Sequence, residues 1–336
     1  MRYAFLLYPH ANARYRASLL TLARAELSMM LAAMGRACAV EAREIAGAPF
    51  LCFEAEAFRE REWALLSRQG GVYLLCRMEG DAFVPMPRAG AAYVGEDMAA
   101  LLKYKGKTNE MFTDTLLSMA LASSAFALKG DAKLAFCDPM CGKGTALYLA
   151  LRRGWNAAGV DADRHAIKEA DDFTGRYLAF HHLKHKRGEG SLTVRGQAGG
   201  RETKYVFADT PEHYRDGDTR TLRLIQGDTR DLDVLLRPGS VQIMAVDLPY
   251  GVQHGPADHR GGILPLLERA APAWHAALAS GGALAASFNT YVTRRAQVIR
   301  ALEAAGFDVL RGEAYDGLEH WVEQAVNRDV IVARRS

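Results

Sequence analysis

Long apolar runs and paired cysteines are both missing from this sequence of 336 residues. No run is long enough to cross a lipid bilayer, and the first residues lack the long apolar region and cleavage site of a secretory signal. The five cysteines are odd in number and contain no C-x-x-C pair, so neither a disulfide framework nor a zinc site is indicated. With 49% hydrophobic and 24% charged residues, the chain has the composition of a soluble globular protein, and we expect it in the cytoplasm with no membrane partner.

The sequence also lacks a strong excess of either charge, since its formal net charge is only +3. Global charge therefore does not indicate a nucleic-acid partner. A local basic run, residues 181–187, contains Lys184, Lys186 and Arg187. Taken alone, such a run is typical of a solvated helix end. Near a site that acts on a nucleic acid, the same side chains become candidates for phosphate contacts.

Residues 1–80 form a predicted N-terminal unit. Their hydrophobic pattern predicts strands and helices in the order β-α-β-β-α-β, which is the ferredoxin-like arrangement. Residues 81–108 contain several prolines and glycines and are expected to form a linker. A helix rich in Met, Leu and Ala follows over 109–128, with Thr108 or Asn109 as its N-cap.

Residues 109–336 form the second predicted domain. From residue 131 onward, strands and helices alternate, which favours a doubly wound α/β sheet that ends in an antiparallel hairpin. One segment, 175–218, is longer than a helix-to-strand connection requires, and segments of this length inside compact domains are usually functional or disordered. Because this segment carries the basic run, we expect an insertion that faces the substrate.

A glycine-containing loop, residues 138–145, follows the first strand predicted in this domain. Gly142 and Gly144 allow the backbone to turn sharply and to approach a ligand closely at the carboxyl end of a strand. The loop does not match a P-loop, because Lys143 is followed by glycine and no earlier glycine has the required spacing. Nor does it match the dinucleotide fingerprint, because Leu147 occupies the third small position.

Acidic residues follow the next predicted strands. Asp161 lies 17 positions beyond Gly144 (161 − 144), a spacing that fits one helix and one strand. Asp228 follows a later strand, whereas Asp163 is better explained as the N-cap of the next helix. A single acid of this kind is more often a helix cap or a solvated loop residue. Their order at successive strand ends indicates a ligand site.

A second short loop, Asp247-Leu248-Pro249-Tyr250, follows a predicted strand over 241–246. By itself this loop is equally well explained as an ordinary turn. Together, however, the two loops resemble those of the Rossmann-type RNA methyltransferases, in particular the tRNA guanine-N2 methyltransferase group. The first is similar to their loop for S-adenosylmethionine (SAM), and the second to their D-P-P-Y loop. The resemblance covers about residues 100–336 and departs from that group at Leu248 and in the lack of a recognisable THUMP domain.

The resemblance implies a Rossmann-like class I SAM methyltransferase domain preceded by a small ferredoxin-like α+β domain. It also implies that SAM is held by the glycine loop, by the acids at the strand ends and by the segment before the helix over 109–128. In that comparison, Asp161 accepts from the ribose hydroxyls and Asp228 from the adenine amino group. The implied cofactor residues are Asp138, Pro139, Gly142, Gly144, Thr145, Asp161, Asp228, Thr108 and Met111.

The 247–250 loop is implied to carry the reaction. An exocyclic base amine is a poor nucleophile because its lone pair is delocalised into the ring. The enzyme must therefore supply hydrogen-bond acceptors for its N–H groups and align its nitrogen with the methyl group. The carboxylate of Asp247 and the carbonyl of Leu248 are the expected acceptors. Pro249 fixes the turn, and Tyr250 offers a ring for stacking on the base.

The sequence therefore predicts a SAM-dependent methyltransferase that acts on an exocyclic base nitrogen of RNA, with guanine N2 of tRNA as the leading substrate. The basic run is the expected RNA contact. A DNA amino-methyltransferase acting on adenine N6 or cytosine N4 is the alternative enzyme, because the same loop serves both. A non-catalytic nucleic-acid-binding protein with a methylase fold is a third hypothesis, supported only by Leu248.

Overall fold

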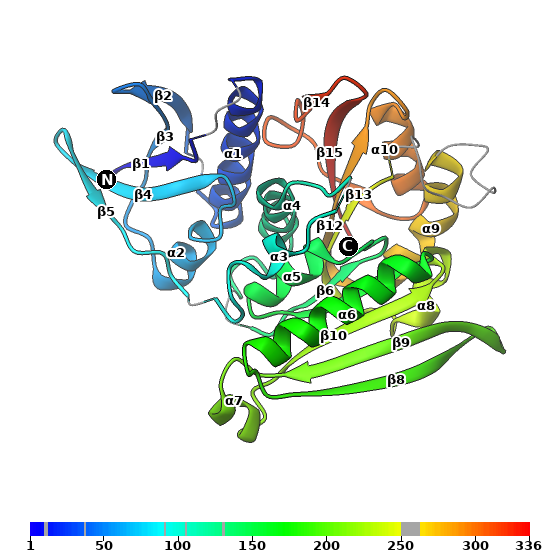
Figure 1. Cartoon of the computed structure of the whole chain (residues 1–336). Helices are drawn as coiled ribbons and strands as arrows, with labels where there is room; N and C mark the ends of the chain where they lie inside the picture. The colour runs from blue at the N-terminus through cyan, green and yellow to red at the C-terminus, as the bar shows by residue number, and fades with distance from the viewer. Residues whose placement is uncertain (10–12, 37, 91, 105, 130–131, 250–262) are drawn as a thin grey trace.

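The computed structural model describes residues 1–9, 13–36, 38–90, 92–104, 106–129, 132–249 and 263–336. Within these residues the chain forms two β-sheets, one in the N-terminal unit and a larger one in the rest of the chain (Figure 1). None of the described helices combines the length and the apolar character needed to cross a membrane.

The N-terminal unit is ferredoxin-like, as the sequence predicts. Its strands lie in the order β2-β3-β1-β4-β5, and every neighbouring pair is antiparallel. The additional strand β5 continues this sheet into the segment that the sequence treats as a linker. The elements in chain order are β1 (Arg2–Leu7), α1 (Ala13–Ala33), β2 (Glu41–Ile45), β3 (Ala48–Glu54), α2 (Glu60–Leu66), β4 (Val72–Glu79) and β5 (Ala82–Pro85).

The larger sheet has a parallel centre and antiparallel edges. Its order is β13-β15-β12-β11-β6-β7-β10-β9-β8, and β14 pairs with β15. The pairs among β12, β11, β6, β7 and β10 are parallel, whereas β15 runs antiparallel to β12 and β13. The strands are β6 (Ala135–Asp138), β7 (Asn156–Asp161), β8 (His185–Val194), β9 (Gln197–Phe207), β10 (Arg220–Gly227), β11 (Val241–Asp247), β12 (Leu278–Asn289), β13 (Asp308–Val309), β14 (His320–Glu323) and β15 (Val326–Arg334).

This strand order defines the fold. When β6, β7, β10, β11, β12, β13 and β15 are numbered 1 to 7, their spatial order is 3-2-1-4-5-7-6, with strand 7 antiparallel. That is the order of the Rossmann-like class I methyltransferase fold, and the predicted fold class is confirmed.

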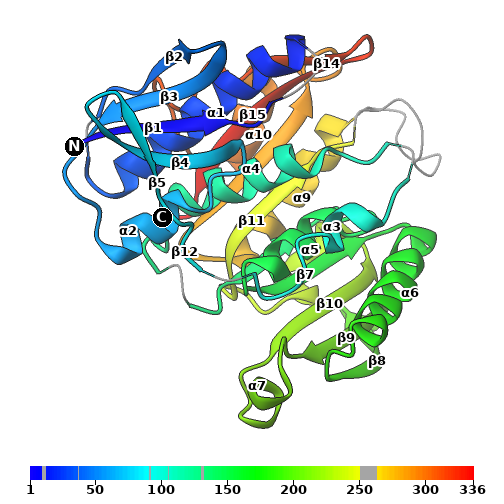
Figure 2. The ribbon, with the colours of Figure 1, turned by 60° about the vertical axis from the view of Figure 1, so that its left-hand side comes forward.

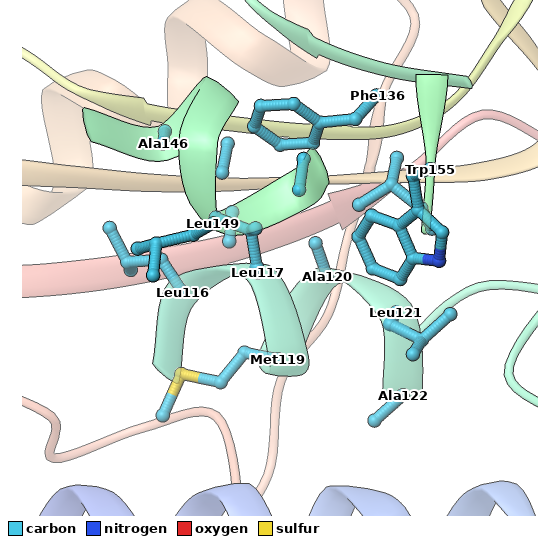
Figure 3. Packing of buried hydrophobic residues seen from close by; sticks show 14 of the residues in the cluster. Leu116, Leu117, Met119, Ala120, Leu121, Ala122, Phe136, Ala146, Leu149 and Trp155 are labelled. Atoms are coloured by element: carbon cyan, nitrogen blue, oxygen red, sulfur yellow. The ribbon is translucent and has the colours of Figure 1, made fainter. Parts of the chain in front are cut away.

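Alternate residues of the central strands enter two separate cores, because successive side chains point to opposite faces of a sheet. On β11, Ile243 and Ala245 belong to one core, whereas Met244 and Val246 belong to the other. The first core lies under α4 and α5, where α4 packs against Phe136 and Trp155 (Figure 3). The helices are α3 (Met98–Leu101), α4 (Glu110–Ala122), α5 (Thr145–Arg152), α6 (Arg164–Phe180), α7 (Pro211–Arg215), η1 (Thr229–Asp231), α8 (Leu232–Leu235), α9 (Ile263–Ala277) and α10 (Arg295–Ala304).

The N-terminal unit docks on the larger domain through α1, which lies along α4 (Figures 1 and 2). A buried carboxyl group lies near this junction. Glu26 of α1 is fully buried, and its Oε1 accepts a 3.0 Å hydrogen bond from the backbone N–H of Gly70. Burial raises the pKa of Glu26 to about 8, and nearby Asp114 on α4 acts in the same direction. Glu26 is therefore largely protonated in the folded protein at neutral pH.

Replacing Glu26 by glutamine is expected to remove a pH dependence of stability. The folded state keeps the Glu26 proton up to about pH 8, whereas an unfolded chain releases it near the ordinary value of 4.5. The free energy of unfolding should therefore fall as pH rises from about 5 to 8, by at most a few kcal/mol from this group. Denaturant unfolding at pH 5 and pH 8 should show a smaller decline for Glu26→Gln. The exposed Glu60→Gln is the control, and an unchanged decline in Glu26→Gln would contradict this account.

The segment 175–218 forms the end of α6, the β8–β9 hairpin and the short helix α7. The hairpin extends the sheet beyond β10, at the end of the molecule farthest from the N-terminal sheet (Figure 2). Since β9 is antiparallel to β10, residue 207 pairs with residue 220 at the amino end of β10, and residue 200 pairs with residue 227 at its carboxyl end. The hairpin tip therefore lies at the carboxyl edge of the sheet.

Candidate functional site

The candidate site lies at the carboxyl edge of the parallel strands, where ligands bind in open α/β sheets. The loops after β6, β7, β10, β11 and β12 all leave the sheet at this edge. Most of the residues predicted for the site therefore come from one edge, although they are spread over more than a hundred positions of the chain.

Backbone conformation explains both glycines of the 138–145 loop. Gly142 and Gly144 have φ of +50° and +92°, in the left-handed region that other residues rarely adopt. Gly144 is the N-cap of α5. The loop is also tied to the end of β7, because the backbone N–H of Cys141 donates to the carbonyl of Val160 at 3.0 Å.

A third glycine, Gly159, two residues before Asp161 on β7, permits this close packing. A Cβ atom there would lie 2.5 Å from Leu147 Cδ1 and 2.6 Å from Cys141 Sγ. The side chains of Cys141 and Leu147 thus pack directly against the backbone of Gly159. Any larger residue on β7 at this point would push the loop away from the strand.

Asp161 orders the loop that it faces. Its Oδ2 accepts from the backbone N–H of Gly142 at 2.8 Å, and its Oδ1 accepts from that of Asp163 at 2.8 Å. Burial raises the pKa of Asp161 above its ordinary value, although these two hydrogen bonds act against the rise. Each oxygen retains capacity to accept another donor. Asp163 in turn accepts from the N–H of His165 at 2.8 Å, so its predicted capping role is confirmed.

Asp138 is a buried acid with a single hydrogen bond in the described structure. Its Oδ1 accepts from the backbone N–H of Met140 at 3.0 Å. Burial raises its pKa to about 8, and the negative charges of Asp161 and Asp247 add to the rise. The hydrogen bond from the Met140 N–H acts in the opposite direction and only partly offsets this rise in the pKa. Pro139, next in the chain, is also buried.

Tyr104 borders the same loop, and sequence reasoning missed it. Its hydroxyl lies 3.1 Å from the hydroxyl oxygen of Thr145, at the start of α5. The ammonium group of Lys143 lies 4.9 Å from the centre of its ring. Burial raises the pKa of Tyr104. An aromatic residue in a segment without regular secondary structure gave no pattern that could have indicated this position.

Asp228 follows β10, as the sequence predicts, and it is held by Arg230. Its carboxylate accepts from the Arg230 backbone N–H at 2.9 Å and from the Arg230 guanidinium. The hydrogen bond from that side chain is the main reason that the pKa of Asp228 lies below its ordinary value. A cavity of about 300 Å³ lies beside it, lined by Arg195 of the hairpin tip, Arg269 of α9 and the acid Asp231. Asp228 is therefore part of the lining of a polar cavity.

Asp247 is surrounded by groups from three separate parts of the chain. Its two oxygens accept hydrogen bonds from the hydroxyls of Ser287, at the end of β12, and of Thr108. The guanidinium of Arg328, on β15, lies 3.8 Å from Asp247 Oδ2. The Arg328 guanidinium also stacks on the ring of Phe112, 4.2 Å from its centre. The carboxylate is thus oriented and charge-compensated before any substrate is present.

The sequence did not indicate Ser287 or Arg328, because neither residue follows a motif. Their roles depend on strand pairing: Ser287 is the partner of Asp247 in the β11–β12 register, and β15 lies on the far side of β12. His320 adds a buried ring 5.4 Å from Phe112. Burial lowers the pKa of His320 to about 4, so this ring is neutral at physiological pH.

The remainder of the 247–250 loop is partly described. The backbone N–H of Leu248 donates to the carbonyl of Ser287 at 2.9 Å, and the Leu248 side chain is buried in the second core. Pro249 is exposed, and Tyr250 lies outside the described residues. The leucine that departs from the D-P-P-Y pattern therefore anchors the loop by packing.

The segment before α4 approaches Asp247 through Thr108. We expected Thr108 at the cofactor, and its observed partner is Asp247. Asn109 is the N-cap of α4, with its side chain accepting from the N–H groups of Met111 and Phe112, which decides between the two predicted caps. Met111 is partly exposed in the first turn of α4.

The basic run does not lie over this site, and the expectation that it would is wrong. Residue 185 pairs with residue 207, at the end of the hairpin next to the amino end of β10, because the hairpin runs antiparallel along that strand. Arg187 pairs with Asp171 at 2.7 Å and with Glu189 at 2.6 Å. Lys184 and Lys186 are exposed at this distant edge.

Only distant similarities to solved structures are found for this chain. No family model and no curated protein matches the chain. Among solved structures, TrmN from Thermus thermophilus is 17% identical, with a TM-score of 0.42, over 90% of this chain and 60% of that one. This chain thus spans 60% of the TrmN length. Magnesium protoporphyrin IX methyltransferase from Synechocystis PCC 6803, solved with bound SAM, is 17% identical, with a TM-score of 0.38 over 71% and 90% of the two chains. A TehB-like SAM-dependent methyltransferase from Corynebacterium glutamicum is 16% identical, with a TM-score of 0.35 over 63% and 85%.

Proposed function

We propose that the protein is a SAM-dependent methyltransferase that modifies an exocyclic base nitrogen of RNA, with guanine N2 of tRNA as the leading substrate. The observation that carries the proposal is the arrangement around Asp247. A carboxylate held at the end of the fourth central strand faces the same edge as a glycine loop and a row of acids at the neighbouring strand ends.

The residues at this edge fit the chemistry of SAM. The left-handed glycines at 142 and 144 leave the loop without side chains where a ligand must approach. Asp161 keeps acceptor capacity for two ribose hydroxyls after binding the N–H groups of Gly142 and Asp163. The buried carboxyl of Asp138 suits a cationic ligand. When bound, SAM supplies an electrophilic methyl group on a positively charged sulfur.

Asp247 performs the two tasks that an exocyclic amine requires. Its carboxylate accepts an N–H of the amine, which fixes the nitrogen and its lone pair, and its negative charge offsets the positive charge that grows on nitrogen as the new bond forms. Ser287 and Thr108 keep both oxygens in a defined orientation. To reach the carboxylate, the amine must compete with the Thr108 hydroxyl or use the remaining lone pairs.

The burial of Leu248 bears on the non-catalytic hypothesis. The side chain packs in the core while the loop stays hydrogen-bonded to β12, and the acceptor proposed at position 248 is a backbone carbonyl, which leucine carries as proline does. The substitution by leucine is therefore compatible with catalysis.

SAM affinity should rise with pH through the titration of Asp138. In the free protein the carboxyl has a pKa of about 8, and binding a cation favours its charged form. Affinity should therefore increase by up to about tenfold per pH unit from pH 6 toward pH 8 and level off above. Calorimetric titrations across this range test the effect. Asp138→Asn cannot ionise, so its SAM affinity should not change with pH over this range. A wild-type affinity that is equally independent of pH would contradict the proposed role of Asp138.

Methyl transfer from labelled SAM to total tRNA, ribosomal RNA and genomic DNA tests the substrate class. We expect label in RNA, with tRNA the best substrate, and little in DNA. Label in DNA alone would establish the amino-methyltransferase alternative. Absence of transfer to all three, in a preparation that binds SAM, would refute the proposed nucleic-acid substrate.

A further inference from the structure

The turn after β12 carries an exposed aromatic side chain, and it follows a strand residue that contacts Asp247. Tyr291 is 60% exposed and Val292 is 44% exposed, at the carboxyl edge of the sheet. The turn begins at Asn289, two residues beyond Ser287, which contacts Asp247. In the β12–β15 register, Asn289 pairs with Arg328, whose guanidinium lies 3.8 Å from Asp247. The turn is therefore adjacent to the proposed catalytic carboxylate.

Buried hydrogen bonds make this turn rigid. Asn289 is 3% exposed, and its side-chain oxygen accepts from the N–H groups of Tyr291 and Asn327 at 3.2 Å each. Its side-chain nitrogen donates to the carbonyl of Ala325 at 2.9 Å, so one amide joins the turn to the β14–β15 hairpin. The Thr290 hydroxyl donates to Glu319 at 2.9 Å. The backbone that carries the exposed Tyr291 ring is thus held by hydrogen bonds to the β14–β15 hairpin.

A free cation lies two residues beyond the exposed pair. Arg294 is exposed, and within the described part of the chain it takes part in no ion pair. The intervening Thr293 is buried, whereas Tyr291 and Arg294 on either side of it are exposed. An exposed aromatic ring and a guanidinium within one short segment are the groups that bind unpaired nucleotides, with the ring stacking on a base and the cation contacting a phosphate.

We propose that Tyr291 and Arg294 form a binding platform for a nucleotide that flanks the target base in single-stranded RNA. This inference rests on the proposed function and adds a second part of the substrate that the protein binds, the nucleotide next to the target base. Tyr291 stacks on the flanking base, Val292 extends the apolar surface, and Arg294 pairs with a backbone phosphate. Because every base has a stacking face, the platform favours unpaired loops without specifying their sequence.

Binding of a tRNA substrate to Tyr291→Ala and Tyr291→Phe tests the platform. Alanine should weaken RNA binding by about 5- to 150-fold, the range for loss of one stacked base, whereas phenylalanine should bind like the wild type. SAM affinity should be equal in all three proteins. Tyr73→Ala removes a tyrosine of similar exposure, 55%, from the N-terminal sheet and is the matched control. Arg294→Ala should reduce the salt dependence of binding by a slope of about 0.7, the value for one phosphate contact on a single strand.

The outcomes separate the platform from the proposed function. Wild-type affinity in Tyr291→Ala, or an equal loss in Tyr73→Ala, would overturn the platform while leaving RNA methylation intact. Failure of the wild-type protein both to bind and to methylate RNA would overturn the proposed function and the platform with it. Loss of affinity in Tyr291→Ala with rescue by Tyr291→Phe would support stacking rather than a hydrogen bond from the hydroxyl.

Discussion

Replacing Asp247 by alanine is expected to lower kcat for methyl transfer by about 100- to 1,000-fold while SAM affinity stays nearly unchanged. The carboxylate is the acceptor that aligns the amine and offsets its developing charge, and removal of one such preorganised group has effects of this size. The carboxylate belongs to the fourth central strand, and the acids assigned to SAM follow other strands. The loss should therefore appear in the chemical step, which single-turnover kinetics measures directly.

A control is needed because Asp247 also organises its surroundings. Loss of the carboxylate removes a negative charge 3.8 Å from the buried Arg328 guanidinium, which lies over the ring of Phe112, so the variant can lose stability as well as activity. Thermal unfolding separates the two effects. Asp172→Ala, which removes an exposed acid of α6 that pairs with Lys168 at 2.6 Å, should keep its kcat. A kcat for Asp247→Ala within about tenfold of the wild type would remove Asp247 from the proposed mechanism.

Replacing Asp161 by alanine is expected to weaken SAM binding by about 100-fold or more. Hydrogen bonds to a charged group contribute roughly 1.5–3 kcal/mol each, and this carboxylate is assigned two ribose hydroxyls. The change also removes the acceptor for the Gly142 N–H, which disorders the glycine loop and acts in the same direction. Isothermal titration with SAM gives the affinity of each protein.

Asp163→Ala is the matched control for Asp161→Ala, since the two acids are separated by one residue. Asp163 caps α6 and has no role assigned at the ligand, so its loss should lower the free energy of unfolding by about 1 kcal/mol and leave SAM affinity almost unchanged. Equal losses of affinity in the two variants would mean that the loop as a whole, rather than the Asp161 carboxylate, determines binding.

The sequence could predict the elements of the sheet because their signals are local. The apolar residues of a strand such as Val241–Asp247 indicate burial, and the glycines at 142 and 144 indicate left-handed backbone. Each of these signals lies within a few residues of the chain. The direction of the β8–β9 hairpin could not be predicted in this way. Whether its basic end meets the site depends on pairing with β10, which joins residues that are far apart in the chain.

The same distinction applies to the site. Asp161 and Asp247 follow strands directly, so the sequence indicated both. Ser287, Tyr104 and Arg328 act through contacts with partners 40 or more positions away, and nothing in their local sequence separates them from ordinary strand or loop residues. Thr108 was assigned to the cofactor from its place in the chain, and only the folded structure shows its hydrogen bond to Asp247.

Mass spectrometry of nucleosides from RNA that the protein has methylated with labelled SAM tests the central claim most directly. The account predicts that the label lies on an exocyclic base nitrogen, as N2-methylguanosine when tRNA is the substrate, and that Asp247→Ala yields almost none. Label on a ring nitrogen, a ring carbon or the ribose, or equal yields from Asp247→Ala and the wild type, would contradict the role of Asp247 as the acceptor for the target amine.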